Sequence, residues 1–119
     1  MTELRILVVE DNERNMRLFR DVLEAAGQRT LAASTGERAV ELAGQHAPDL
    51  VLMDIQLPGI GGVEALERLR SDERTRAVPV LALTAQAMEG DRERFLEAGF
   101  DGYLSKPVDI AELVDTVRR

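Results

Sequence analysis

Four of the five short apolar runs in this chain end in side chains that suit Mg²⁺ or phosphate. In chain order these side chains are Glu10 and Asp11, Asp54, Thr84 and Lys106. The remaining run, residues 30–33, has no such ending. The carboxyl ends of parallel strands lie at one edge of a sheet, where open α/β sheets bind their ligands. Three carboxylates, a hydroxyl and an ammonium therefore predict one site at that edge.

The three acids predict a site for a divalent cation. A single aspartate at a strand end commonly only caps a loop, but Asp54 is expected beside a strand that ends in Glu10 and Asp11. Three carboxylates without a cation would repel one another and raise one another's pKa. A site with oxygen ligands and no nitrogen or sulfur ligands suits Mg²⁺. A carboxylate beside Mg²⁺ can attack a phosphoryl group and form an aspartyl phosphate.

Thr84 and Lys106 supply the other groups that phosphoryl transfer requires. This reaction depends mostly on positioning and charge neutralisation, to which a hydroxyl and an ammonium contribute. Lys106 is the only lysine, against fourteen arginines. A compact ammonium suits a small phosphoryl oxygen better than a planar guanidinium does. We therefore expect Lys106→Arg to keep Mg²⁺ binding and to lose the conformational response to phosphorylation.

Composition limits the class of protein. The 119 residues, 45% apolar and 31% charged, fit one globular domain over residues 1–119. The net charge of −7 and the scattered basic residues argue against nucleic-acid binding. With no bilayer-length apolar run, no signal peptide and no cysteine, we expect a cytoplasmic protein without a membrane contact. The single histidine, His46, is expected in a solvated loop, which excludes Ser-His-Asp and Cys-His catalysis.

Strands and helices are predicted to alternate five times. The strands are expected at residues 5–10, 29–33, 50–54, 80–84 and 102–105. The helices are expected at residues 12–26 and 35–45, up to about Ser71, within 88–98, and from Asp109 onward. Helical spacing in the first helix is kept by Leu18, Phe19, Val22, Leu23 and Ala26. This alternation predicts a parallel sheet with right-handed crossovers and helices on both faces.

Several motifs, all in order, resemble the receiver domains of two-component response regulators. They are Glu10-Asp11-Asn12, Met53-Asp54-Ile55-Gln56-Leu57-Pro58 with Gly62, Leu83-Thr84-Ala85, and Ala98-Gly99 followed by Tyr103-Leu104-Ser105-Lys106-Pro107. The resemblance covers nearly the whole chain, and residues 12–16 and 85–91 look most similar to DivK-type single-domain regulators and to hybrid-kinase receivers. It implies a flavodoxin-like fold, with a five-stranded parallel sheet in the order 2-1-3-4-5.

The resemblance implies that Asp54 accepts phosphate from a phosphohistidine of a histidine kinase or phosphotransfer protein. Asp11, Asp54 and the backbone carbonyl of Gln56 would hold Mg²⁺, and Glu10 would act directly or through water. Glu10 replaces the aspartate that many family members carry, which lengthens the reach to the metal. The protein would not be an enzyme beyond catalysing its own phosphorylation and slow dephosphorylation.

The same resemblance implies a conformational response. Thr84 and Lys106 would bind the phosphoryl oxygens, and Pro107 would follow a cis peptide bond. Tyr103 would be an aromatic switch residue, although an ordinary half-buried strand aromatic explains it equally well. A downstream protein would bind the fourth helix, fifth strand and fifth helix, and residues 12–16 would meet the phosphodonor protein.

Three other classes of protein fit the sequence less well. Phosphatases with an aspartate nucleophile typically carry a second aspartate two residues later, where this chain has Gln56. A dinucleotide-binding loop at residues 59–62 fails because Glu64 occupies its third glycine position and the loop contains Pro58. A phosphate-independent interaction module would usually have lost the acceptor or the acids. The chain is either a stand-alone bacterial receiver or a receiver excised from a hybrid histidine kinase or multidomain regulator.

Overall fold

The computed structural model describes residues 3–57, 59–84, 91–105, 113 and 115. Lys106 and Pro107 lie outside these residues, as does most of the helix expected from Asp109. The expectations for these segments therefore stay predictions.

Five parallel strands form one sheet in the order β2-β1-β3-β4-β5. The strands are β1 (Arg5–Val9), β2 (Arg29–Ala33), β3 (Leu50–Asp54), β4 (Val80–Thr84) and β5 (Gly102–Ser105). The described helices are α1 (Glu13–Ala25), α2 (Gly36–His46), α3 (Gly62–Ser71) and α4 (Asp91–Ala98). The α/β class and the strand order are both confirmed.

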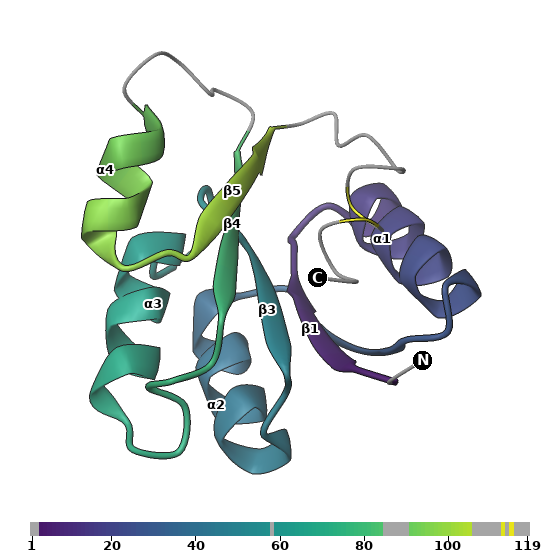
Figure 1. Ribbon diagram of the computed structural model, residues 1–119, viewed down its shortest axis with the longest axis horizontal. Coiled ribbons are helices and arrows are strands. Elements are labelled where there is room, and N and C mark those ends of the chain that lie inside the picture. Colours follow the sequence, from purple (N-terminus) through teal and green to yellow (C-terminus); the bar gives the residue numbers. More distant parts are fainter. Residues whose placement is uncertain (1–2, 58, 85–90, 106–112, 114, 116–119) are drawn as a thin grey trace.

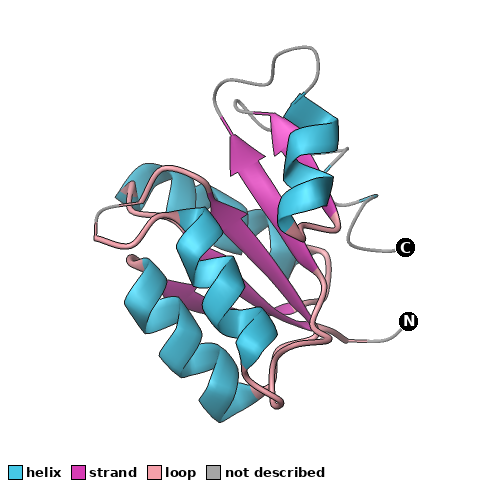
Figure 2. Ribbon diagram, turned by 90° about the vertical axis from the view of Figure 1, so that its left-hand side faces the viewer, coloured by secondary structure: helices cyan, strands magenta, loops and turns pink. Residues whose placement is uncertain are grey.

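Two apolar clusters, one on each face of the sheet, hold the layers together. Alternate residues of a strand point to opposite faces, so Leu7 and Val9 pack with α2, α3 and α4, while Ile6 and Val8 pack with α1. Figure 1 shows α1 on one side of the strands and the other three helices opposite, and Figure 2 views the three-helix side. All five residues of β3 are buried, as predicted for a strand covered on both faces.

Short polar side chains start the first two helices. The Asn12 side-chain oxygen accepts a hydrogen bond from the backbone N–H of Asn15 (3.1 Å), and the Thr35 hydroxyl accepts one from that of Arg38 (3.1 Å). Each bond satisfies one of the N–H groups that a helix start leaves without a partner. These caps fix where the chain turns from each strand end into the following helix.

Three details differ from the sequence predictions. β1 ends at Val9, although the backbone N–H of Glu10 still donates to Ala33 (3.0 Å). His46 is the last residue of α2, not a loop residue, because the N–H of Ala47 continues the helical bonding to Ala43 (3.1 Å). Leu18 is 45% exposed. Neighbouring helical residues point about 100° apart, so a helix that buries Phe19 turns Leu18 away from the sheet.

Candidate functional site

Three carboxylates meet at the carboxyl edge of the sheet. One oxygen each from Glu10, Asp11 and Asp54 lies within 4.8 Å of the other two. The register explains the meeting, because Val9 pairs with Met53 and the chain places Glu10 and Asp54 one residue further along adjacent strands. The acid cluster predicted from the sequence is therefore present. We refer to these three residues as the acid cluster.

Burial and backbone hydrogen bonds orient two of the three acids. Glu10 is 2% exposed and Asp54 is 5% exposed, whereas Asp11 is exposed. One Glu10 carboxylate oxygen accepts from the N–H of Asn12 (3.3 Å), and one Asp54 oxygen accepts from the N–H of Gln56 (2.9 Å). Each acid thus receives a donor from two residues further along its own loop. These two bonds hold the carboxylates of Glu10 and Asp54 in place at the edge of the sheet.

Gly62, the first residue of α3, lies directly against the backbone of Asp54. A Cβ at this position would lie 2.5 Å from the Asp54 carbonyl oxygen and 3.0 Å from the Ile55 Cα. The N–H of Gly62 donates to the Ile55 carbonyl (3.2 Å), and the N–H of Ile55 donates to Leu83 on β4 (3.0 Å). The first turn of α3 can therefore contact the end of β3 only because residue 62 has no side chain.

Thr84 ends the strand next to that of Asp54. It is 6% exposed and pairs in register with Ser105 at the end of β5. Lys106 directly follows Ser105, but its placement lies outside the described residues. Of the sequence-predicted set, the structure brings together the three acids and places Thr84 at the same sheet edge.

Tyr103 is half-buried on the face of the sheet that α4 covers. It pairs in register with Ala82, so its side chain shares a face with that of Thr84 two residues further along β4. Its ring centroid lies 5.7 Å from that of Phe95, which contacts Phe100 edge-to-face at 6.1 Å. Sequence analysis missed Phe95. Its signal was the pair Phe95 and Phe100 around Gly99, a spacing typical of the hydrophobic contact at a helix C-terminus.

The donor set of the acid cluster fits a hard divalent cation. Three carboxylates offer oxygen ligands only, which Mg²⁺ prefers over nitrogen or sulfur. Mg²⁺ usually takes one or two carboxylates and keeps several waters. A partly exposed cluster such as this, with Asp11 facing solvent, leaves room for those waters.

Comparison with known proteins decides the family. Residues 6–118 match the response regulator receiver domain. The chain belongs to this family. It is 47% identical over 113 residues to the polar-differentiation response regulator DivK of Brucella ovis, which covers 95% of this chain and 92% of that protein. DivK of Brucella anthropi is 46% identical over the same length.

Solved structures of receiver domains share the fold. The receiver domain of sensor histidine kinase PA1611 from Pseudomonas aeruginosa is 40% identical, with a TM-score of 0.90 over 99% of this chain and 97% of that one. Its structure holds a magnesium ion coordinated in the active-site cleft. Chemotaxis response regulator CheY4 of Vibrio cholerae, 24% identical with a TM-score of 0.92 over 99% of this chain and 98% of that one, shows the same fold. In the part of the chain that the structure describes, no helix is long and apolar enough to cross a membrane.

Proposed function

We propose that this receiver domain accepts a phosphoryl group on Asp54 from a phosphohistidine of a histidine kinase or phosphotransfer protein. The observation that carries the proposal is the meeting of three carboxylate oxygens within 4.8 Å at a sheet edge. Asp54 is the acceptor in this scheme because it is central in the sheet, and its carboxylate is oriented by the N–H of Gln56. The 40% identical receiver that binds magnesium supports the same assignment.

Glu10, Asp11 and Asp54 would hold Mg²⁺, together with the backbone carbonyl of Gln56. When bound, the ion supplies positive charge that offsets the repulsion between these acids and the incoming phosphoryl oxygens. Burial of Glu10 and its bond from the N–H of Asn12 keep that carboxylate in place before a ligand arrives. Such preorganisation avoids rearrangement during the reaction.

The transfer step exchanges one bond to phosphorus for another. An Asp54 oxygen forms a bond to phosphorus while the phosphorus–nitrogen bond of the donor breaks, and the bonding electron pair stays on the departing imidazole nitrogen. The Thr84 hydroxyl and the Lys106 ammonium would bind the transferred oxygens, since transfer depends mainly on positioning and charge. We propose no turnover of a separate substrate, so the protein acts as a signalling component of the cytoplasm and not as a conventional enzyme.

We further propose that Thr84 and Tyr103 transmit the phosphorylated state. Both side chains share the sheet face that α4 covers, and only the small side chain of Ala82 lies beside Tyr103 in the register. Movement of the Thr84 hydroxyl toward a phosphoryl group would change the space available to the Tyr103 ring and to Phe95, which contacts it. Phosphorylation can bias this equilibrium only by its different affinity for the two states. The face formed by α4, β5 and the last helix would then bind a downstream protein.

One experiment tests the acceptor and the switch together. The protein is incubated with phosphoramidate and Mg²⁺, and intact mass and tyrosine fluorescence are recorded. Tyr103 is the only tyrosine and the chain has no tryptophan, so the fluorescence reports this ring alone. We expect one phosphoryl adduct and a fluorescence change in the native chain, and neither in Asp54→Asn or after chelation of Mg²⁺.

Asp49→Asn is the matched control, because Asp49 is exposed and lies before β3, away from the acid cluster. It should be phosphorylated like the native chain. An undiminished adduct in Asp54→Asn would refute the acceptor assignment. An adduct without any fluorescence change would refute the switch and leave the acceptor in place.

A further inference from the structure

A groove of about 450 Å³ lies between α1 and β2, and Glu10 and Asp11 of the acid cluster are among the residues that line it. Side chains from α1 form one wall, and Ala32 of β2 and the following Ser34 line the other side. The α1 residues lining it are Glu13, Met16, Arg17, Arg20, Asp21 and Glu24. Ala32 and Ser34 are exposed, so α1 leaves this part of the strand uncovered. We call this feature, with the outer edge of β2, the α1–β2 groove.

The outer edge of β2 presents backbone groups to solvent. β2 lies at one end of the strand order, and among the described residues only β1 pairs with it. The N–H of Arg29 bonds to Leu4 and the carbonyl of Ala33 accepts from Glu10, so alternate residues from 29 to 33 face β1. The N–H and carbonyl groups of Thr30 and Ala32 therefore point away from the sheet. An open strand edge is a template for another extended segment.

The lining of the α1–β2 groove carries more acidic than basic side chains. Arg20 is engaged within the protein, because it donates to the Thr30 hydroxyl (3.0 Å) and pairs with Glu24 (3.7 Å). Asp11, Glu13 and Asp21 are all exposed, and no described residue forms an ion pair with any of them. The remaining basic side chain in the lining, Arg17, offsets only part of this charge.

We propose that the α1–β2 groove binds an extended segment of a partner protein that carries lysine or arginine at alternate positions. Such a segment would add to the sheet about 4.8 Å from β2 and bond to the outward groups of Thr30 and Ala32. Every second side chain would then project into the groove, within reach of Asp11, Glu13 and Asp21. A second copy of this chain fits poorly, because two acidic edges would face each other at a net charge of −7 per chain. The interaction does not require phosphorylation of Asp54.

The probe is an acetylated and amidated peptide of sequence Thr-Lys-Val-Lys-Val-Lys-Thr, titrated into the full chain at low ionic strength. Binding is measured by calorimetry and by amide NMR, with the largest shifts expected at Thr30 and Ala32. Two further peptides carry N-methyl groups on the lysine amides or on the valine amides. Only alternate amides of an added strand face β2, so one of these peptides should bind and the other should not.

Charge variants separate a defined groove from general attraction to an acidic protein. Glu13→Gln combined with Asp21→Asn should weaken binding about tenfold, an effect that salt should reduce. Glu67→Gln combined with Glu97→Gln removes the same charge from exposed positions on α3 and α4, and should leave the affinity within about twofold. Asp54→Asn should bind the peptide as the native chain does, which separates this proposal from the proposed function.

Four results would overturn the proposal. They are the absence of binding at millimolar peptide, equal binding of the two methylated peptides, equal loss of affinity in the two double variants, and a dimer in solution that protects the amides of β2. The last result would assign the groove to a second copy.

Discussion

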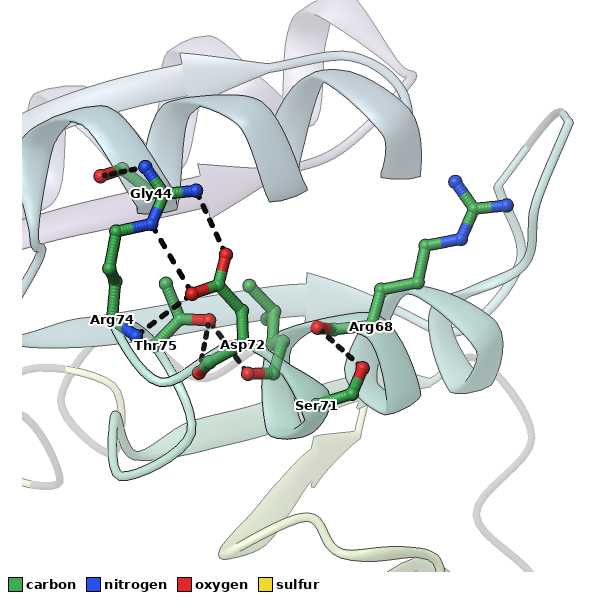
Figure 3. Close-up of polar contacts among 7 residues, drawn as sticks. Gly44, Arg68, Ser71, Asp72, Arg74 and Thr75 are labelled. Carbon is green, nitrogen blue, oxygen red and sulfur yellow. Dashed lines mark hydrogen bonds and ion pairs between the residues drawn. The ribbon is translucent and has the colours of Figure 1, made fainter.

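Acidic side chains lie at the carboxyl edge of the sheet, where the strands end, and at its amino edge, where the strands begin. The two groups of acids differ in their surroundings. At the carboxyl edge, Glu10, Asp11 and Asp54 crowd one another within 4.8 Å. At the amino edge, Asp72 is held by Arg74 through two side-chain bonds (2.9 and 3.2 Å) and one backbone bond (2.9 Å) (Figure 3). The first arrangement gathers negative charge in one place, and the second neutralises it pair by pair.

Arg70 connects several segments of the chain at the amino edge. Its guanidinium donates to the carbonyls of Val78 (2.5 Å) and Gly99 (3.2 Å) and to the carboxylate of Asp101 (3.0 Å). Asp101 in turn accepts from the N–H of Val80 at the start of β4 (2.7 Å). One arginine thus ties the end of α3 to the start of β4, the end of α4 and the residue before β5. The acids paired with arginines at the amino edge fix the fold, whereas the crowded acids at the carboxyl edge suit a ligand.

The largest expected difference between the two edges is in the free energy of unfolding, and two glycine substitutions measure it. Gly62→Ala should destabilise the protein by about 2–3 kcal/mol, because its Cβ would meet the Asp54 carbonyl at 2.5 Å and backbone atoms cannot easily move away. Gly44→Ala should change stability by less than about 1 kcal/mol. Its Cβ would meet the flexible Arg74 guanidinium at 2.7 Å, and alanine favours the helix. Urea unfolding of both variants measures this, and equal losses would contradict the account.

A smaller effect is expected at Asp72, and it should depend on pH. Hydrogen bonds from Arg74 lower the pKa of Asp72 below its ordinary value of 3.8. An acid whose pKa is lower in the folded than in the unfolded state stabilises the fold at pH values above its unfolded pKa. This stabilisation is lost as the pH falls through the pKa of the folded state. Asp72→Asn should therefore lower the Tm slightly at pH 5–8, and the difference should begin to shrink below about pH 4 and vanish below the lowered pKa of the folded state. A difference that grows on acidification would refute the ion pair as its cause.

The residues that lie together at the carboxyl edge could be predicted from the sequence far better than those at the amino edge. Strand ends in a parallel sheet must meet, so Glu10, Asp11, Asp54 and Thr84 could be placed together from hydrophobic runs alone. The roles of Arg70 and Arg74 could not be predicted, because one arginine among fourteen carries no local signal of its distant carbonyl partners. The α1–β2 groove was also missed. It depends on how far α1 leaves Ala32 uncovered, which periodicity does not determine.

The central claim is that the acids at the carboxyl edge form a cation site. The difference in stability between the native chain and Asp11→Asn tests it most directly, because its sign should depend on Mg²⁺. Thermal unfolding of the native chain and of Asp11→Asn is measured in EDTA and again with excess Mg²⁺. In EDTA the variant should be more stable by about 0.5–1 kcal/mol, because removing one of three crowded charges relieves repulsion. With Mg²⁺ the order should reverse, because the native chain binds the ion more tightly and gains stability from it. A variant that is less stable in EDTA, or a difference that Mg²⁺ leaves unchanged, would contradict the account.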